Sequence, residues 1–274
     1  MRIIDTHLHL VYKDRFSYPW LKDAPALDHQ TTAEDYFARA EKLGIDAALH
    51  MEVDVAETDM EAETVFMVGA HQKIAGAIAA CRPESPDFPA YLERIAAIPG
   101  VRGLRRVLHV VPDDVSQAPL FAENIRRLAG HSLTFDLCVA ARQLPLAIAL
   151  AGKCPEVQFV LDHCGVPDIE NEAYAPWAEN ISECARLANV TAKISGVIAY
   201  AGADWNTEKL RPYISHVLDV FTFDRVVWGS DFPVCTIHAS LEDWVASTQE
   251  IVAGATQQEQ ENLFSRNAMR LYRL

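Results

Sequence analysis

The sequence predicts an α/β fold in which residues 1–274 form one domain, a single (β/α)8 TIM barrel. The chain length of 274 residues is close to the ~250 typical of a complete eightfold barrel. Short apolar or β-branched runs alternate with amphipathic stretches at intervals of roughly thirty residues, as βα units require. The first of these runs ends in Thr-His-Leu-His, whereas an open doubly wound sheet usually has a Gly-rich phosphate loop there.

Eight segments are predicted to be strands because each is short, apolar and separated from the next by a helical pattern. Their spacing accounts for the whole chain, and eight such units suffice to close a barrel. The predicted strands are Arg2–His7, Asp46–Met51, Ile74–Ala80, Val101–Leu104, Ser132–Leu137, Val157–His163, Val190–Ser195 and Arg225–Ser230.

The segments between the strands carry helix start and stop signals. Thr31 and Glu34 have the spacing of a capping box, and Gly44 stands where a left-handed C-cap belongs. No linker or low-complexity tract interrupts the series, so the sequence gives no support for a domain boundary. Later helices are predicted to begin at Ser85-Pro86, at Thr207, at Ser240 with Asp243, and at Thr256 with Glu259.

Composition and charge exclude several classes of protein. Half of the residues are hydrophobic, which is typical of a globular chain with a large core. The net charge of −14 opposes binding to nucleic acid or to an anionic membrane surface. Six cysteines without a C-x-x-C pair, no secretory signal and no long apolar run predict a cytoplasmic protein with reduced thiols. The oligomeric state stays open, a homo-oligomer included.

The strongest functional signal is a pair of histidines at the end of the first predicted strand. His7 and His9 are two residues apart, so their side chains point to the same side of the sheet. The C-terminal ends of barrel strands are where catalytic side chains sit. Two imidazoles that meet there can bind a divalent metal ion or an oxyanion.

Asp231 follows the last apolar strand in the sequence Val-Val-Trp-Gly-Ser-Asp-Phe-Pro. A carboxylate at the mouth of a barrel is costly to desolvate unless it pairs with a metal, a cation or a proton. Because the first and last strands of a barrel are neighbours, we expect Asp231 to lie near His7 and His9 and to accept a proton from an attacking water. A helix N-cap or an ordinary loop residue is the alternative.

Two further ionisable residues stand at the ends of the sixth and seventh strands. His163 ends the run Phe-Val-Leu-Asp-His and is predicted to face the active site, with a packing role as the alternative. Lys193 lies among apolar residues in Thr-Ala-Lys-Ile-Ser-Gly. It is a candidate for substrate binding, although a buried lysine also pairs with core carboxylates.

The fourth strand carries Arg105 and Arg106, and a cation there suits a carbonyl, carboxylate or hydroxyl ligand. One of the two arginines is expected to face the pocket, and alternation alone does not say which. Pairing of both with helix carboxylates is the alternative. His109 follows on a predicted loop and is a substrate-binding candidate.

The fifth strand and two tryptophans complete the set of candidates. Asp136 and Cys138 share one parity near the end of the fifth strand, and their pattern fits pocket and core equally. Trp20, in a Pro-containing loop, and Trp228 can supply the flat apolar wall that small-molecule pockets use. Both tryptophans fit plain core packing as well.

Together these segments resemble the amidohydrolase superfamily over nearly the whole chain. Within it they are most similar to lactone hydrolases of the fuconolactonase, rhamnonolactonase and pyrone-dicarboxylate lactonase type. The resemblance is carried by Asp5-Thr6-His7-Leu8-His9, Gly103-Leu104-Arg105, Phe135-Asp136-Leu137, Asp162-His163-Cys164-Gly165, Lys193-Ile194-Ser195-Gly196 and Gly229-Ser230-Asp231-Phe232-Pro233.

The resemblance implies that His7, His9, His163 and Asp231 surround a hydrolytic water, often with bound metal. This chain has no lysine to bridge two metals at the end of its fourth strand, and its fifth strand lacks the expected histidine. One divalent ion is therefore expected, most reasonably zinc on His7, His9 and Asp231, with His163 as an optional ligand. Metal-free catalysis stays open, because the lactonase branch includes members that need no metal.

The expected reaction is hydrolysis of a small lactone, preferentially a sugar aldonolactone. Asp231 would take the proton of the water, while His163, Arg105 or a metal polarises the carbonyl. The substrate-binding candidates are Arg106, His109, Trp20, Asp136, Lys193 and Trp228. A metal-dependent decarboxylase of a small aromatic or unsaturated acid and a non-catalytic barrel that binds a sugar acid are the alternatives.

Overall fold

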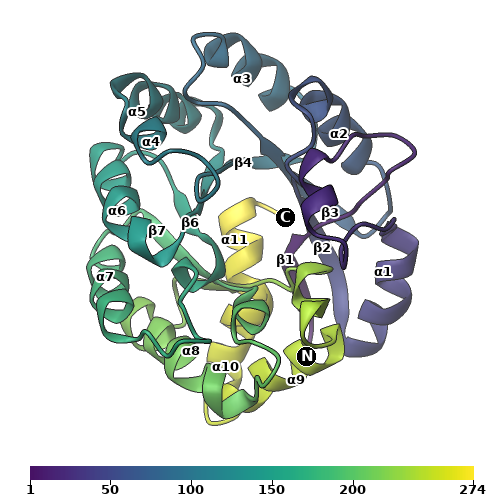
Figure 1. Ribbon diagram of the computed structural model, residues 1–274, viewed down its shortest axis with the longest axis vertical. Helices are drawn as coiled ribbons and strands as arrows, with labels where there is room; N and C mark the ends of the chain where they lie inside the picture. The colour runs from purple at the N-terminus through teal and green to yellow at the C-terminus, as the bar shows by residue number, and fades with distance from the viewer.

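Eight parallel strands form one sheet in the order β1 to β8, and helices surround it, as predicted (Figure 1). The computed structural model describes all residues 1–274. The strands are β1 (Ile3–Leu8), β2 (Ile45–Met51), β3 (Ile74–Ala80), β4 (Val101–Val107), β5 (Thr134–Cys138), β6 (Phe159–Leu161), β7 (Val190–Ile194) and β8 (Val226–Trp228).

The barrel closes where the chain beyond β8 meets the end of β1. The Asp231 amide donates to the His7 carbonyl oxygen, and the His9 amide donates to the Phe232 carbonyl oxygen, both at 2.8 Å. These two bonds lie at the C-terminal end of the strands. The closure therefore fixes the backbone of His7, His9 and Asp231 relative to one another.

Eleven α-helices connect the strands or cover the ends of the barrel, and none combines the length and hydrophobicity of a membrane span. They are α1 (Ala33–Ala40), α2 (Met60–Met67), α3 (Phe88–Ala96), α4 (Asp114–Gln117), α5 (Pro119–Arg126), α6 (Leu144–Lys153), α7 (Ala175–Ala185), α8 (Thr207–Phe221), α9 (Leu241–Ile251), α10 (Gln257–Glu261) and α11 (Asn267–Tyr272). Short 3-10 turns precede or follow several of them.

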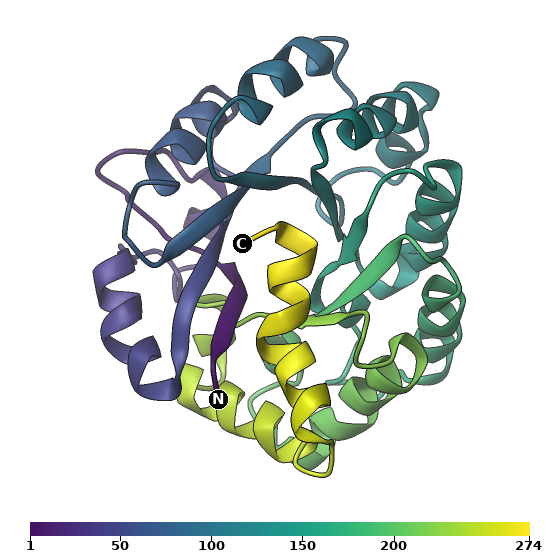
Figure 2. The same ribbon diagram turned by 180° about the vertical axis from the view of Figure 1, so that it is seen from behind.

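The C-terminal helix α11 lies across one end of the barrel, as the view from behind shows (Figure 2). Ala268 and Tyr272 from α11 pack against a layer of buried side chains inside the barrel. This layer seals the N-terminal end of the strands, so a ligand can enter only from the opposite end. The layer consists of Ile4, Leu49, Met51, Ile78, Val160 and Val227.

Helix caps follow the predicted chemistry with local shifts. The capping boxes at Ser240 and Thr256 are confirmed, and Gly44 adopts the predicted left-handed conformation with φ 81°. The first cap was assigned one residue too early, because the side chain of Thr32 and not that of Thr31 accepts the Asp35 amide. Capping signals therefore locate helix starts to within a turn.

Strands β6 and β8 each end two residues before the predicted end, and a turn explains both differences. Strand β6 stops at Leu161, whereas the apolar pattern continued to His163. His163 and Cys164 both have φ 54°, in the left-handed region that non-glycine residues seldom adopt. The chain therefore turns sharply after Leu161, and this turn directs the His163 side chain over the barrel mouth. Asp231, with φ 56°, sits on a similar turn after β8.

Candidate active site

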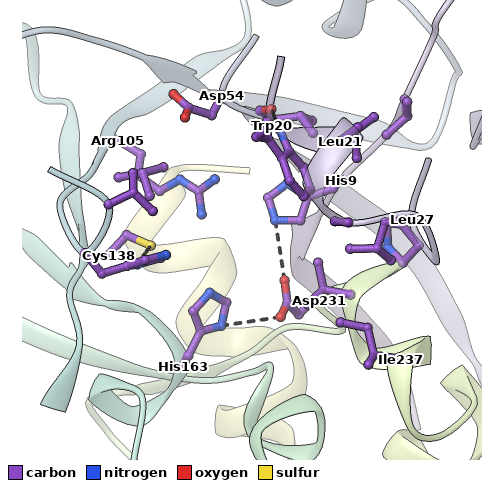
Figure 3. Close-up of a pocket in the computed structure, with 18 of the residues that line it drawn as sticks. His9, Trp20, Leu21, Leu27, Asp54, Arg105, Cys138, His163, Asp231 and Ile237 are labelled. Carbon is purple, nitrogen blue, oxygen red and sulfur yellow. Dashed lines mark hydrogen bonds and ion pairs between the residues drawn. The ribbon is translucent and has the colours of Figure 1, made fainter. Parts of the chain in front are cut away.

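A pocket of about 400 Å³ opens at the C-terminal end of the strands (Figure 3). Enzymes with this fold place their active sites at this end. Most of its lining is apolar and comes from the loops, whereas its floor is polar. The polar lining residues are His9, Asp54, Arg105, His109, His163, Tyr200 and Asp231.

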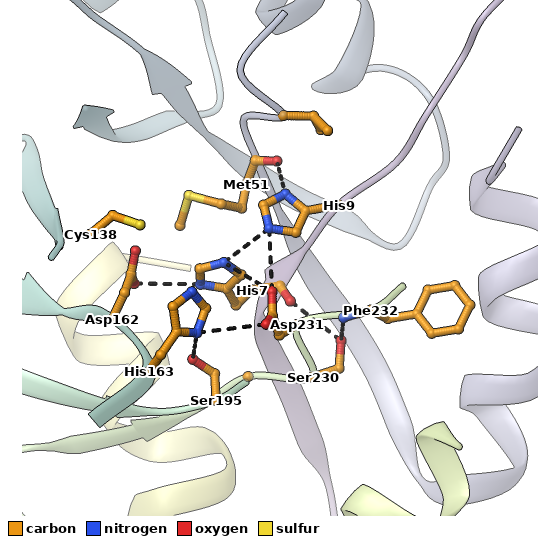
Figure 4. A network of polar contacts seen from close by, with 12 residues as sticks. His7, His9, Met51, Cys138, Asp162, His163, Ser195, Ser230, Asp231 and Phe232 are labelled. Atoms are coloured by element: carbon orange, nitrogen blue, oxygen red, sulfur yellow. Dashed lines mark hydrogen bonds and ion pairs between the residues drawn. The ribbon is translucent and has the colours of Figure 1, made fainter. Parts of the chain in front are cut away.

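His7, His9 and Asp231 converge at the floor of this pocket (Figure 4). The Nε2 atoms of the two histidines are 3.2 Å apart. The Asp231 Oδ1 atom lies 3.6 Å from His7 Nε2 and 3.4 Å from His9 Nε2. All three side chains are buried, so their lone pairs face one another with little access to bulk water.

These three donor atoms fit a divalent metal ion. Ligands bound tetrahedrally to zinc at its usual bond lengths lie about 3.3 Å apart, which matches the observed separations. The His9 Nδ1 atom is 3.1 Å from the Met51 carbonyl oxygen, which only accepts, so Nδ1 carries the proton and Nε2 keeps its lone pair. An arrangement of inward-facing acceptors is costly without a cation or a proton between them.

His163 approaches Asp231 from the other side. Its Nδ1 atom lies 3.0 Å from Ser195 Oγ and 3.8 Å from Asp231 Oδ2. Gly196 makes this approach possible, because a Cβ atom there would lie 2.5 Å from His163 Nδ1 and 2.6 Å from Asp231 Oδ2. The glycine of Lys-Ile-Ser-Gly is thus required by the site itself.

A second polar group lies beneath His7. Lys193 Nζ donates to Asp136 Oδ2 at 2.5 Å and lies 2.9 Å from Asp162 Oδ1. The same ammonium is 3.3 Å from His7 Nδ1, and Asp162 Oδ1 is 3.4 Å from that nitrogen. Lys193 and Asp162 therefore compete for His7 Nδ1, and the outcome decides whether His7 Nε2 offers a lone pair to the pocket.

Arg105 supplies the one permanent positive charge on the pocket lining. Its Nε and Nη2 atoms donate to Glu52 Oε1 at 2.6 Å and to the Glu52 carbonyl oxygen at 2.8 Å. The remaining Nη1 atom points at the floor, 3.4 Å from His7 Nε2. Glu52 thus holds the guanidinium in place and leaves one nitrogen free for a ligand.

Burial controls the protonation of the floor residues. It lowers the pKa of His9 to about 3 and also lowers the pKa of His7 and His163, so all three imidazoles are neutral near pH 7. Burial raises the pKa of Asp231 to about 6, although the neighbouring His163 and Arg105 oppose this shift. A carboxylate with that pKa is ionised at neutral pH and remains basic enough to accept a proton.

Asp162 responds differently to the same burial. Desolvation alone would raise its pKa, but the adjacent Lys193 cation and His7 hold the pKa of this carboxyl well below its usual range. Asp162 is therefore an anion that orients its neighbours, whereas Asp231 is the carboxylate suited to proton transfer.

Residues 4–274 match the protein family described as amidohydrolase. The chain belongs to the amidohydrolase family. Among related proteins, an L-fucono-1,5-lactonase from Burkholderia multivorans is 29% identical over 293 residues, which covers 99% of this chain and 96% of that protein. A 4-sulfomuconolactone hydrolase from Rhizobium radiobacter is 27% identical, covering 84% of this chain and 75% of that protein.

The fold of this amidohydrolase also matches a solved structure over its full length. A crystal structure of an amidohydrolase from Burkholderia multivorans with bound zinc has a TM-score of 0.91 and 24% identity, and 100% of both chains is covered. Family membership and fold therefore agree with the resemblance carried by the sequence motifs.

The structure brings most of the predicted site residues of this amidohydrolase together. His9, His163, Arg105 and Asp231 line the pocket with two substrate-binding candidates, and His7 lies directly beneath them. Lys193 and Asp136 form a buried pair under the floor, out of reach of a ligand in the pocket. The two candidates on the lining are His109 and Trp20, and Cys138, whose pattern fitted pocket and core equally, also lines the pocket.

Besides Lys193 and Asp136, two further substrate-binding assignments are corrected by the geometry. Arg106 does not line the pocket, because it points outward and pairs with Glu84 at 2.8 Å. Trp228 also lies outside the pocket, since its indole stacks on Trp244 and its Nε1 donates to Thr248 Oγ1 at 3.3 Å. The alternatives stated for both residues, an ion pair with a carboxylate and aromatic packing, describe their actual surroundings.

Several residues of the site were missed by the sequence reasoning. Glu52 directly follows the apolar end of β2, so the argument applied to Asp231 would also have selected it. Asp162 and Ser195 stand beside the chosen His163 and Lys193 in their motifs. Tyr200 has no local signal, because it reaches the pocket from a short helical turn after β7.

Proposed function

We propose that this protein is a hydrolase that opens a lactone ring, with Asp231 as the general base. One observation carries the proposal: Asp231 Oδ2 is buried at the pocket floor, has no hydrogen-bond partner, and belongs to a carboxyl whose pKa is about 6. An unpaired buried carboxylate oxygen is costly to maintain, so a ligand or water is expected to bind it. The similarity to two lactone hydrolases supports this reaction class.

The reaction requires one proton transfer to the enzyme and one back. Asp231 accepts a proton from water while the water oxygen bonds to the lactone carbonyl carbon, which gives a tetrahedral oxyanion. The carbon–oxygen bond of the ring then breaks, and the leaving alkoxide takes the proton from Asp231. The product is a hydroxy acid, whose ionisation at neutral pH releases one proton.

Arg105 and His163 are proposed to act on the carbonyl. Burial opposes the charge of Arg105, but Glu52 and nearby anions raise its pKa above the usual value, so Nη1 stays a cationic donor. His163 lies across the pocket from His9, as Figure 3 shows. Fixed donors of this kind stabilise a developing oxyanion without reorganisation.

We propose His7, His9 and Asp231 as ligands of one divalent ion, with zinc the expected metal and His163 nearby on the other oxygen of Asp231. When bound, the ion would polarise the carbonyl and lower the pKa of a bound water. The neutral imidazoles support metal binding, because histidine must be deprotonated to be a ligand.

Two substrate classes are compatible with this reaction, the sugar aldonolactone expected from the sequence and a lactone with few polar groups. His109 and Trp20 are the remaining candidates for substrate recognition, and both line the pocket. A metal-dependent decarboxylase would use the same floor residues, and the similarity to two lactone hydrolases is what favours ring opening.

The test is a panel of lactones followed with a pH indicator, before and after treatment with a chelator. Ring opening is expected to acidify the solution without release of carbon dioxide. If the chelated protein loses activity and zinc restores it, the metal assignment stands; unchanged activity would leave Asp231 acting alone. Carbon dioxide release, or ligand-induced stabilisation without any turnover, would replace the proposal with one of the alternatives.

A further inference from the structure

We propose that the substrate is an uncharged lactone that carries an apolar side chain, not a polyhydroxylated or anionic one. This inference rests on the proposed lactone hydrolysis and assigns the part of the substrate that does not react. It is carried by the lining of the pocket, by its inventory of polar groups and by its rim.

The walls of the pocket are apolar. Twelve of its 19 lining residues are hydrophobic. The aliphatic ones include side chains from three separate loops, namely Leu21, Leu27, Val53, Val234 and Ile237. Figure 3 shows Leu21, Leu27 and Ile237 on the side of His9 and Asp231, away from Arg105. A lactone held at the floor would therefore direct its substituent along aliphatic surface.

Few polar groups are left for substrate recognition once the reaction has used the floor. Outside the proposed reaction, the polar groups on the lining are the Asp54 carboxylate, the His109 ring and the single Tyr200 hydroxyl. Asp54 is paired with Arg82 at 3.3 Å, and His109 Nδ1 contacts Cys138 Sγ at 3.4 Å. Each hydroxyl buried without a partner costs about 1–3 kcal/mol, so a sugar ring with several hydroxyls is poorly matched to this pocket.

The pocket lining does not suit an anionic substituent either. Arg105 is the only lining residue with a permanent positive charge, and Glu52 already occupies two of its three nitrogens. Asp54 and Asp231 place negative charge on the same lining. A carboxylate or sulfonate on the substrate would face these groups, and the remaining Arg105 nitrogen is already assigned to the reacting carbonyl.

The rim continues the apolar wall into solvent. Val110 is 61% exposed and Ile237 is 42% exposed, although both line the pocket. Large aliphatic side chains at the entrance of a cavity, continuous with its wall, extend the surface that an alkyl chain can cover. The rim thus favours a substituent long enough to reach it from the floor.

The first experiment compares lactones of one ring size. δ-Decalactone, D-glucono-1,5-lactone and 2-pyrone-4,6-dicarboxylate share a six-membered ring but carry an alkyl chain, hydroxyls or carboxylates. Initial rates are measured with a pH indicator and corrected for spontaneous opening. We expect kcat/KM to be on the order of 100-fold higher for the alkyl lactone, because its chain buries several methylene groups. Equal or faster turnover of either polar lactone would overturn the inference and leave the proposed function intact.

A matched pair of variants locates the effect at the pocket. Val110→Asn places a polar group on the rim, whereas Val65→Asn makes the same change at a similarly exposed residue of α2 outside the pocket. We expect Val110→Asn to raise KM for the alkyl lactone about three- to tenfold, and Val65→Asn to leave it unchanged. An unchanged KM in both variants, or equal changes in both, would contradict a substrate contact at the rim.

Binding separates failure of the inference from failure of the proposed function. Six-membered lactams with an alkyl chain or with hydroxyls resist hydrolysis, and their affinity is measured by calorimetry. If no lactone is turned over but the alkyl lactam binds more tightly, the hydrolase proposal fails and the apolar pocket stands. Tighter binding of the polyhydroxylated lactam overturns the inference, and binding of neither lactam together with no turnover overturns both.

Discussion

The two ends of the barrel are formed by the same eight strands, yet they carry opposite kinds of side chain. At the N-terminal end the interior is an apolar layer with α11 packed across it. At the C-terminal end the interior is occupied by imidazoles, carboxylates, Lys193 and Arg105, nearly all buried. The N-terminal end is therefore stabilised by apolar packing. At the C-terminal end, burial of charged groups costs free energy unless they are paired.

The buried charges are tolerated because they form pairs. Lys193 with Asp136 and Asp162, and Arg105 with Glu52, balance most of the charge inside the barrel. Asp162 and Asp136 also have oxygens without a hydrogen-bond partner, but both carboxylates lie against the Lys193 cation. Asp231 is the exception at the floor, since its carboxylate meets only histidines and its Oδ2 atom has no hydrogen-bond partner. The comparison teaches that the chemistry belongs to the group left unpaired, while the paired groups position it. The following predictions separate these two roles.

Asp231→Asn is expected to have the largest effect on activity. The amide keeps the size of the side chain but is not a base, so kcat should fall about 10³- to 10⁴-fold. The melting temperature should change little, since the substitution removes a poorly compensated charge. Lactone assays and thermal unfolding of the same sample test both statements, and near-normal turnover would exclude Asp231 as the base.

Lys193→Met is expected to damage stability more than any other single change at this end. It leaves Asp136 and Asp162 buried without their cation, and breaking a buried pair costs about 3–5 kcal/mol. Urea unfolding measures the loss. The double variant Lys193→Met/Asp136→Asn serves as control and should recover part of it; a loss below about 1 kcal/mol in the single variant would show that the pair is not structural.

The barrel and its catalytic residues could be predicted because both follow from strand periodicity. His7 and His9 share one face of β1, and closure of the barrel brings β8 beside β1, so Asp231 had to lie near them. The same logic did not choose between Arg105 and Arg106. Which of the two faces the pocket depends on the register of β4, and the ion pair of Arg105 with Glu52, the residue that follows β2, shows that it is Arg105.

The walls of the pocket could not be predicted in this way. Leu27, Val53 and Ile237 come from loops whose side chains have no period, and they meet only because the barrel brings their strands together. Trp228 shows the opposite error, in which a residue was assigned to the pocket but does not line it. It is apolar and close to Asp231 in sequence, but it occupies the outer face of β8 and packs on α9. Proximity to a catalytic residue in sequence is therefore a poor guide to the lining.

The activity is expected to depend on pH through the unpaired carboxylate. Burial raises the pKa of Asp231 to about 6, and the base acts only when deprotonated. The value of kcat/KM should therefore rise with pH up to about 6 and level off above it, with an approximately tenfold loss one unit below. The residual activity of Asp231→Asn should lack this limb; if the limb persists there, another group produces it.

Ile78→Val tests the opposite end of the barrel and has the smallest expected effect. Ile78 is fully buried in the layer beneath the charged groups, and removing one methylene group leaves a small cavity. The free energy of unfolding should fall by about 0.5–1.5 kcal/mol. The value of kcat/KM should stay unchanged, because Ile78 does not line the pocket. A loss of activity without a loss of stability would mean that the apolar layer also positions the floor, and the division between the two ends would fail.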